Sequence, residues 1–480
     1  MTLKLKVLSG LKWSAAGKLL GQLISWISTI VVIRMLEPSD YGLMSLSIIF
    51  TSLCYVLSQM GLGSSIVQSK KFGDLLLQQV FSLVILSNSI IFILLWSNAV
   101  GVSEFFDSPD LASIMRVQAF QFLFSMFGVV SYAKLLRAMN YRAIAITDFF
   151  SFLLNTLVTL YLAWHGFGVW ALVYGGMSGV VSRTVLLNIY SPYINRPTFN
   201  FNGFKSAANF GLMTSLDQVL WYVYSNLDRF IIGKFLGPSS LGIYSIALQL
   251  ASLPLEKVGQ IINQIAFPAY SEIQGDHQRV AQYTLRIGNL ISMLSFPLFF
   301  GISVTAPVFV PLLVGDKWLE AIIPLQLLAL LGPLKIINAT TQPAISGVGF
   351  PSVNVKNLLI ACLIMSVSFL IGIRWGILGI CYSWLIGFSI WFFIMLKIGA
   401  PYLGLSSSRI LSPLLSPAIV SVFMYAFVYM IYDYIINFQI NLIHQLLILV
   451  LSGLTFQVIV YRIFLKERLL NAYGLVRINK

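Results

Sequence analysis

Apolar residues run along this chain in long stretches that are separated by short polar turns. A helix needs about 20 apolar residues to cross the hydrocarbon core of a bilayer. Since lipid offers no partners for backbone N–H and C=O groups, helices are the expected form of these stretches. The pattern predicts an all-α integral membrane fold with fourteen spans, near residues 12–34, 41–67, 78–100, 111–133, 144–164, 168–190, 206–235, 240–266, 286–312, 319–341, 354–373, 377–396, 411–432 and 442–463.

The turns between the predicted spans alternate in charge. Basic residues gather in every second turn, as with Lys70 and Lys71 or Lys134 and Arg137. The other turns are acidic or neutral, as with "EPSD" at 37–40, apart from the single arginine of "RWG" at 374–376. Because basic loops stay in the cytoplasm, this alternation predicts an even number of spans with both termini cytoplasmic. The basic start of the chain runs into an apolar stretch without a small-residue cleavage site, so we expect a retained first span.

Composition supports a polytopic membrane protein. The 480 residues are 58% hydrophobic and 10% charged, with a mean hydropathy of +0.87, whereas a soluble domain is about 25% charged. The net charge of +14 is better explained by topology and contact with anionic lipids than by nucleic-acid binding. Cys54, Cys362 and Cys381 lie in apolar runs at no metal-binding spacing, so we expect no metal site.

Two stretches of sequence recur about 200 residues apart. "RMLEPSDYGLMSLS" begins at Arg34 and "KFLGPSSLGIYSIA" begins at Lys234, with shared Pro, Ser and Gly positions, and "GVWALVYG" at 168–175 is echoed by "GILGICYS" at 376–383. An even number of spans separates the copies, so they share one orientation, as in transporters that hold substrate between two halves. The expected divisions are spans 1–6 in residues 1–200, spans 7–12 in 201–400, and two added spans in 401–480.

Nearly the whole chain resembles one superfamily of membrane transporters. The two six-span halves plus two spans, the turn "LEPSDYG" and the stretch "NLDRFIIGKFLGPSSLGIYS" are similar to the polysaccharide-exporter branch of the multidrug/oligosaccharidyl-lipid/polysaccharide superfamily, in particular to Wzx-type and colanic-acid-exporter-like flippases. The resemblance implies a V-shaped fold of two lobes in the bacterial inner membrane. It also implies alternating-access transfer of undecaprenyl-diphosphate-linked oligosaccharides from the cytoplasmic to the periplasmic leaflet, with other polysaccharide assembly proteins as partners.

Span 7 carries a polar and aromatic stripe. Asp217, Trp221, Tyr224 and Asp228 follow the spacing i, i+4, i+7, i+11 and therefore share one helix face. Aromatic faces cover sugar C–H surfaces and carboxylates accept hydroxyl hydrogens, so this face is a candidate lining for a sugar path. The alternative is a packed contact between helices with paired charges.

Spans 1 and 8 carry related polar faces. Lys18, Gln22 and Ser25 lie on one face of span 1, although Lys18 is near enough to the cytoplasmic end to snorkel. In span 8, Glu256 lies on a polar face with Lys257 beside it. The resemblance places spans 1, 2, 7 and 8 at the lateral openings, which makes both faces candidates for substrate binding.

Charges inside the predicted spans are positive in excess. The cations number six and the anions four: Lys18, Arg116, Arg183, Arg229, Lys257 and Lys335 against Asp148, Asp217, Asp228 and Glu256. Such an excess suits an anionic ligand such as a lipid diphosphate. We expect some of Lys18, Arg183, Lys257 and Arg229 to attract it.

The charges near the periplasmic end of span 7 suggest a gate. Asp228 and Arg229 are adjacent and point about 100° apart on a helix, so they cannot pair ideally with each other. We expect them to form part of a periplasmic gate between the two halves, with Arg34 and Asp40 as cross-repeat partners.

The sequence carries no catalytic signature. GxGxxG, Walker A and H-E-x-x-H motifs are missing, so we expect a transporter without a cofactor, and the coupling ion, H⁺ or Na⁺, stays open. One alternative is a drug or cation antiporter of the same superfamily, which predicts a more acidic interior. Another is an integral-membrane polysaccharide polymerase, which predicts a large periplasmic loop.

Overall fold

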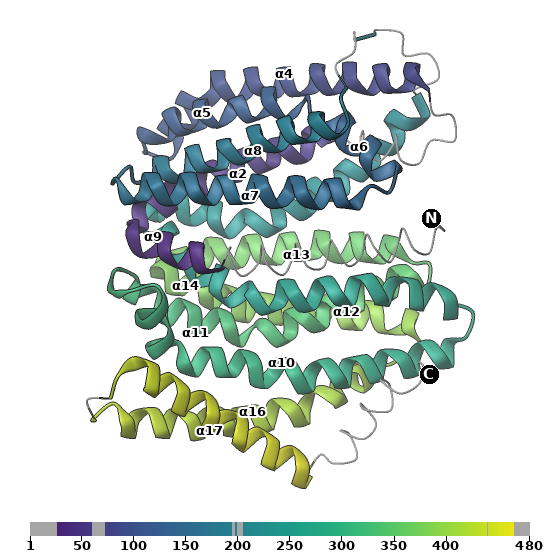
Figure 1. The fold of residues 1–480 in the computed structure, drawn as a ribbon. Coiled ribbons are helices and arrows are strands. Elements are labelled where there is room, and N and C mark those ends of the chain that lie inside the picture. The colour runs from purple at the N-terminus through teal and green to yellow at the C-terminus, as the bar shows by residue number, and fades with distance from the viewer. Residues whose placement is uncertain (1–25, 60–72, 194–196, 199–204, 439, 465–480) are drawn as a thin grey trace. The chain divides into compact units, whose positions relative to one another are not determined.

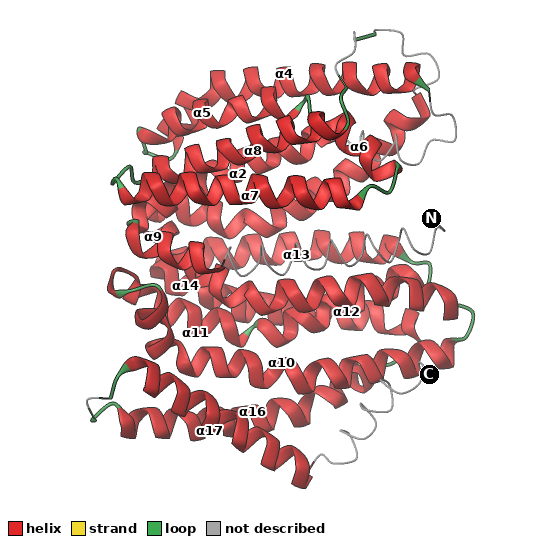
Figure 2. Cartoon of the chain, viewed as in Figure 1, coloured by secondary structure: helices red, strands yellow, loops and turns green. Residues whose placement is uncertain are grey.

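A computed structural model describes residues 26–59, 73–193, 197–198, 205–438 and 440–464, with side chains at 205–217 and 256–269 left out. Within these ranges all regular elements are helices, as the fold class predicted from the sequence requires (Figures 1 and 2). Two compact units divide the chain, Met1–Gly242 and Ile243–Lys480. The boundary therefore falls after the turn that follows span 7, whereas the sequence repeat begins near residue 200, and each unit is described by itself below.

The first unit is a bundle in which α7 packs along α8, α4 along α5, and α2 against α4, α5 and α8. Small residues permit close packing, as membrane helices require. For example, Gly175 of α8 lies against Thr159 of α7, where a Cβ on residue 175 would come within 1.8 Å of the Thr159 hydroxyl. Its helices are Trp26–Met35, α2 (Pro38–Gln59), α4 (Asp74–Phe105), α5 (Asp110–Ser125), α6 (Val129–Arg137), α7 (Tyr141–Trp164), α8 (Val169–Tyr190) and the first part of α9 (Lys205–Ile273).

Span 4 was predicted as one helix and is instead broken. α5 and α6 meet at an angle of 46°, because the chain tightens at Gly128, whose N–H bonds to the Ser125 carbonyl three residues back. The break leaves the Phe127 carbonyl without a helical partner, and the Asn188 side chain of α8 donates to it at 2.8 Å. Broken helices persist in membranes where neighbouring helices satisfy the freed backbone groups in this way.

The 69-residue α9 is two helices joined at Gly237, whose φ of 78° and ψ of 178° are not helical. It ends at Ile273, and α10 begins after Asp276, which accepts hydrogen bonds from the backbone N–H groups of Gln278 and Arg279. Just before this turn the Tyr270 hydroxyl contacts Thr284 at 3.0 Å. Burial raises the pKa of Tyr270, so the phenol stays neutral.

The second unit is built around α10, which packs on α11, α12, α16 and α17. The Tyr461 hydroxyl of α17 donates to the Met293 carbonyl of α10 at 3.1 Å, which ties the last helix to this unit. Its helices are α10 (His277–Leu313), η1 (Asp316–Ala321), α11 (Ile322–Leu330), α12 (Gly332–Gly347), α13 (Pro351–Gly372), η2 (Ile373–Trp375), α14 (Gly376–Ser383), the π-helix η3 (Trp384–Phe388), α15 (Ser389–Gly399), η4 (Ala400–Leu403), α16 (Ser407–Ile435) and α17 (Leu442–Phe464).

Within the described residues, nine helices are long and apolar enough to cross a membrane, and eleven if each bent pair counts as one span. Two of the nine, Gln218–Leu255 and Pro351–Leu403, contain non-helical glycines at residues 237 and 376 and cover the stretches predicted as spans 7–8 and 11–12. The predicted number of fourteen spans remains a prediction, because part of the first predicted span lies outside the described residues.

The sequence repeat has a structural counterpart. Gly168 and Gly376 precede equivalent helices with nearly the same backbone angles, φ 53° and ψ −133° against φ 66° and ψ −152°. The bent pair α5/α6 corresponds to the bent pair formed by Asp316–Leu330 and Gly332–Gly347, at 46° and 42°. Both copies thus share their turns and a broken fourth helix.

Candidate functional site

The predicted substrate-binding residues are only partly described. Lys18, Gln22 and Ser25 lie outside the described residues, as do the side chains of Asp217, Glu256 and Lys257 in α9. Arg183, Trp221 and Tyr224 are described, and so are the four gate candidates. The geometry below therefore concerns the C-terminal half of span 7 and the interior of each unit.

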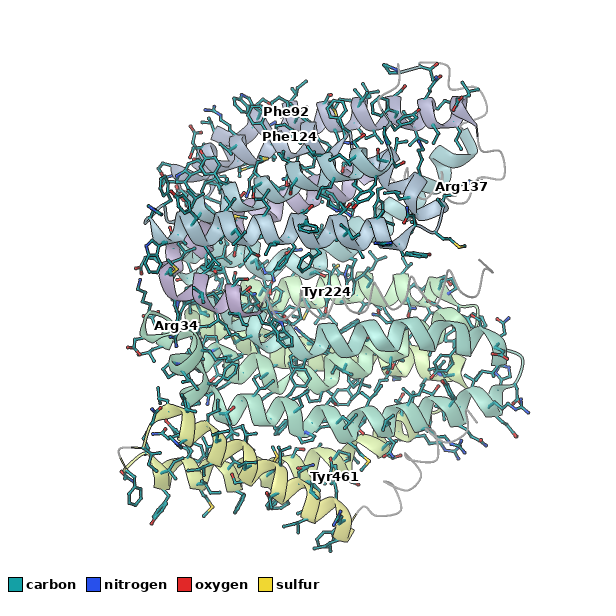
Figure 3. The ribbon with its side chains drawn as sticks, viewed as in Figure 1. Arg34, Phe92, Phe124, Arg137, Tyr224 and Tyr461 are labelled. Carbon is teal, nitrogen blue, oxygen red and sulfur yellow. The ribbon has the colours of Figure 1, made fainter. Side chains whose placement is uncertain are left out.

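The stripe predicted on span 7 does not have one uniform environment. Trp221 is exposed, whereas Tyr224 is buried and Asp228 is fully buried (Figure 3 labels Tyr224). The Trp221 and Tyr224 rings lie 5.5 Å apart. Next to the stripe, the Tyr222 hydroxyl donates to the Ile49 carbonyl of α2. The stripe thus changes from an exposed aromatic surface to a buried, hydrogen-bonded contact toward its C-terminal end.

Asp228 is fully buried at this end of the stripe, and Arg229 beside it is partly buried. The backbone N–H of Arg229 donates to the Asp228 carboxylate at 2.8 Å, and Arg229 Nη1 donates to the Asn226 side chain at 2.8 Å. In the described part of the chain, the Arg229 Nε is buried and makes no hydrogen bond. The guanidinium is therefore held by its own helix on one side and keeps an unused donor on another.

Asp40, the proposed partner of these charges, caps two helices. Its carboxylate accepts from the backbone N–H of Glu37, which precedes α2, and from the backbone N–H of Val169, which begins α8, each at 3.0 Å. Both N–H groups lack helical partners, so the carboxylate satisfies donors that would otherwise be orphaned. Arg34, the other proposed partner, is exposed (Figure 3).

Arg183 is paired inside the first unit. Its Nε lies 3.0 Å from the Asp148 carboxylate of α7, and its guanidinium lies 5.1 Å from the centre of the Tyr132 ring. The Arg183 and Asp148 side chains are 41% and 52% exposed, so the protein covers neither of them completely. Both charges were predicted to lie inside spans, but the sequence did not indicate that they pair with each other.

A second cation contact, in the other unit, was not predicted. Lys335 Nζ lies 3.9 Å from the centre of the Trp384 ring, and the Trp384 indole N–H donates to the Tyr244 hydroxyl at 2.8 Å. Trp384 begins the π-helix η3, a helix type that often marks functional positions. The only sequence signal was the lysine inside an apolar run.

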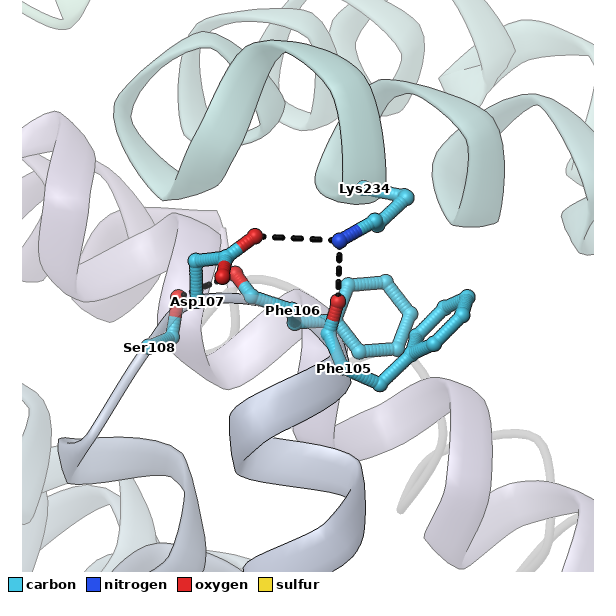
Figure 4. A network of polar contacts seen from close by, with 5 residues as sticks. All are labelled: Phe105, Phe106, Asp107, Ser108 and Lys234. Carbon is cyan, nitrogen blue, oxygen red and sulfur yellow. Dashed lines mark hydrogen bonds and ion pairs between the residues drawn. The ribbon is translucent and has the colours of Figure 1, made fainter.

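Lys234 was also missed, although it is the repeat equivalent of Arg34. Its Nζ lies 3.0 Å from the Asp107 carboxylate and 2.5 Å from the Phe105 carbonyl (Figure 4). The repeat aligns Lys234 with Arg34, but it does not indicate which loop Lys234 contacts.

An apolar groove of about 630 Å³ lies along α13 and α14 in the second unit. Ile371, Trp375, Tyr382 and Ile386 form exposed walls, and small residues such as Gly372 and Gly379 form its floor. Among the described residues no group of His, Cys, Asp and Glu could hold a metal ion.

Comparison with known proteins gives one family. The family model described as polysaccharide biosynthesis protein matches residues 31–323, more than half of the chain. The chain is 25% identical to the lipopolysaccharide biosynthesis protein WzxC of Escherichia coli (strain K12) over 340 residues, which cover 70% of this chain and 69% of that protein. It is 23% identical to the succinoglycan biosynthesis transport protein ExoT of Rhizobium meliloti (strain 1021) over 337 residues, which cover 70% and 68%.

The fold is similar to a solved transporter structure. The lipid II flippase MurJ, in an inward closed conformation, matches with a TM-score of 0.74 at 16% identity and covers 94% of this chain and 99% of that chain. At this identity the match concerns the fold alone.

Proposed function

Because the chain belongs to the polysaccharide biosynthesis protein family, we propose that it flips lipid-linked oligosaccharides across a membrane for the synthesis of a surface polysaccharide. The family match over residues 31–323 carries the proposal. The superfamily predicted from the sequence is confirmed by this match, and the chain is a multi-pass membrane protein of transporter fold. WzxC and ExoT, which take part in polysaccharide synthesis by name, support the substrate class.

The charged turns support a direction of transport and a location for the protein. Basic turns on one side favour a cytoplasmic position for both termini in a bacterial inner membrane, so the substrate moves from the cytoplasmic to the periplasmic leaflet. The protein acts on the lipid-linked sugar by transport rather than by a chemical reaction. A gradient of ions or of the substrate itself drives the cycle, because the sequence has no Walker A motif to bind ATP.

Substrate recognition has an electrostatic part and an aromatic part. Arg183, together with Lys18, Lys257 and Arg229, attracts the diphosphate. The pairing of Arg183 with Asp148 keeps the cation neutralised inside the bilayer until a phosphate displaces the carboxylate. Exposed Trp221 offers a ring face to the sugars.

The gate is assigned to the periplasmic end of span 7. Buried Asp228 and partly buried Arg229 change partners between the closed and open states, with Arg34 as the cross-repeat candidate. The unused Nε donor of Arg229 supports this assignment, because a guanidinium with an open donor can take a new partner at low cost. Asp40 caps the starts of α2 and α8 in this proposal. It keeps these hydrogen bonds when the gate opens.

Reconstitution tests the function directly. Purified protein in liposomes should speed the appearance of a fluorescent undecaprenyl-diphosphate oligosaccharide in the opposite leaflet, measured by quenching with a membrane-impermeant reductant. Empty liposomes are the control, and a labelled phospholipid without sugar tests for scrambling. Equal rates with and without the protein, together with transport of a cationic dye, would replace the flippase by the antiporter alternative.

A further inference from the structure

The periplasmic end of span 7 is fastened to the end of α4 within the first unit. Lys234 Nζ reaches the Asp107 carboxylate at 3.0 Å and the Phe105 carbonyl at 2.5 Å, and it lies 4.9 Å from the centre of the Phe105 ring (Figure 4). One ammonium group thus makes an ion pair with Asp107 and both a hydrogen bond and a cation–π contact with Phe105.

The end of α4 is shaped to receive a cation. α4 ends at Phe105, and its C-terminus carries the negative end of the helix dipole. The N–H groups of the following turn bond to the Val102, Ser103 and Glu104 carbonyls, and Lys234 donates to the Phe105 carbonyl. Asp107 adopts a φ of 51°, a left-handed conformation that aspartate tolerates better than most residues. This turn presents a carboxylate and a free carbonyl on the same side, and Lys234 binds both (Figure 4).

An aromatic contact lies one helical turn before the lysine. The Phe230 ring lies 5.9 Å from the Phe105 ring and 5.2 Å from the Phe106 ring. Phe106 is 2% exposed and also meets Phe50 of α2 at 5.7 Å. Phe230 and Lys234 are four residues apart, so one face of α9 carries both the apolar and the charged contact.

We propose that Phe230 and Lys234 form a releasable latch that holds the periplasmic end of span 7 on the end of α4 and opens once in each transport cycle. Lys234 is a positioning residue in this proposal, since it acts through α9 and touches no substrate. The proposal rests on the transport function proposed above and adds residues that lie outside the gate of Asp228 and Arg229.

The exposure of the contacts makes the latch weak enough to open. The Asp107 side chain is 80% exposed and that of Lys234 is 29% exposed, and exposed ion pairs typically shift an equilibrium by only about two- to fivefold. A buried pair of the same geometry would hold one state too firmly for a cycle. The aromatic contact supplies a second attraction that does not depend on salt.

The test measures the position of span 7 without using substrate. A cysteine replaces Ile231, which is buried on α9 one helical turn before Lys234 and beside Phe230, in a background where Cys54, Cys362 and Cys381 are alanine. A membrane-impermeant maleimide then reports how often this part of α9 separates from the end of α4. The variants are Lys234→Ala, Lys234→Arg, Asp107→Asn and the exchange of Lys234→Asp with Asp107→Lys. Glu104→Gln removes a charge next to the same turn and is the matched control.

We expect Lys234→Ala and Asp107→Asn to raise the labelling rate at residue 231 about two- to fivefold and to reduce polymer export. Lys234→Arg and the charge exchange should restore both values, and Glu104→Gln should change neither. Unchanged labelling in both Lys234→Ala and Asp107→Asn would overturn the latch. Because the labelling needs no substrate, a failure of lipid-linked oligosaccharide transport with intact latch-dependent labelling would refute the proposed function and leave the latch standing.

Discussion

The Asp40 carboxylate accepts a hydrogen bond from the backbone N–H of Val169, 129 residues further along the chain, at 3.0 Å. The same carboxylate accepts from the backbone N–H of Glu37, so one side chain closes the first turns of α2 and α8. Gly168 fits this contact because its φ is 53° and because a Cβ there would lie 2.9 Å from the Asp40 oxygen.

Replacing Asp40 by alanine should destabilise the first unit. Loss of one helix cap costs about 0.5–2 kcal/mol, and here two helix starts lose their acceptor. Thermal unfolding in detergent, followed by the recovery of monodisperse protein, should show a lower midpoint for Asp40→Ala. Asp74→Ala is the control, because Asp74 also lies in a first helical turn, that of α4, and no side-chain cap is formed there. Equal midpoints for the two variants would contradict the double cap.

The two repeat turns pack against each other reciprocally. A Cβ on Gly42 would lie 1.7 Å from the Pro238 carbonyl oxygen, and a Cβ on Gly242 would lie 1.8 Å from the Pro38 carbonyl oxygen. These four residues are the repeat equivalents of one another, so the same contact is made twice. Backbone atoms cannot move aside as a flexible side chain can.

Alanine at Gly42 or Gly242 should therefore lower stability by about 1–3 kcal/mol, as overpacking of a close contact does. The two substitutions should have similar effects, and thermal unfolding in detergent measures them. Gly101→Ala in α4 serves as the control, since no atom lies within 4 Å of its Cβ position and alanine favours a helix. A stable Gly42→Ala protein would mean that the contact is looser than described.

Much of the fold could be predicted because it depends on local sequence. The apolar runs gave the helices, and the identical Pro and Gly residues gave the repeat, since a turn and a close approach need those residue types. The breaks in spans 4 and 10 could not be predicted, because Gly128 is tolerated in many helices. The break depends on Asn188, 61 residues later, which satisfies the Phe127 carbonyl.

The candidate site was less predictable. The Asp148–Arg183 pair was within reach of the sequence, because Asp148 lies 16 residues before the end of α7 and Arg183 lies 14 residues after the start of α8. Two antiparallel helices bring such positions to the same depth. The contacts of Asp40 with Val169 and of Lys234 with Asp107 join helices that are not neighbours in sequence. The spacing of apolar and polar residues therefore cannot predict them.

Substitutions at Arg183 and at Asp148 should change transport in opposite directions. Arg183→Ala removes a cation that we assign to the diphosphate and should reduce export. Asp148→Asn removes the competing carboxylate and should strengthen substrate binding, which lowers the substrate concentration for half-maximal flipping. Lys356→Ala, a cation in the first turns of α13, is the control for a general charge effect. If Arg183→Ala and Asp148→Asn weaken transport equally, the pair has only a structural role.

Substitution of Asp228 tests the proposed gate. The carboxylate is fully buried, and a buried charge is retained in a membrane protein only where donors or cations surround it. Asp228→Asn should weaken the closed state, because the amide keeps a hydrogen-bond acceptor but loses the charge. A cysteine in place of Tyr224, which is 6% exposed, should then be labelled faster from the periplasmic side, and export should fall.

Exchange of the charges of Asp228 and Arg34 should partly restore export if Arg34 is the partner. Asp433→Asn, at an exposed carboxylate of α16, is the control. Unchanged labelling with normal export in Asp228→Asn would make the carboxylate a static packing feature and move the gate to other residues.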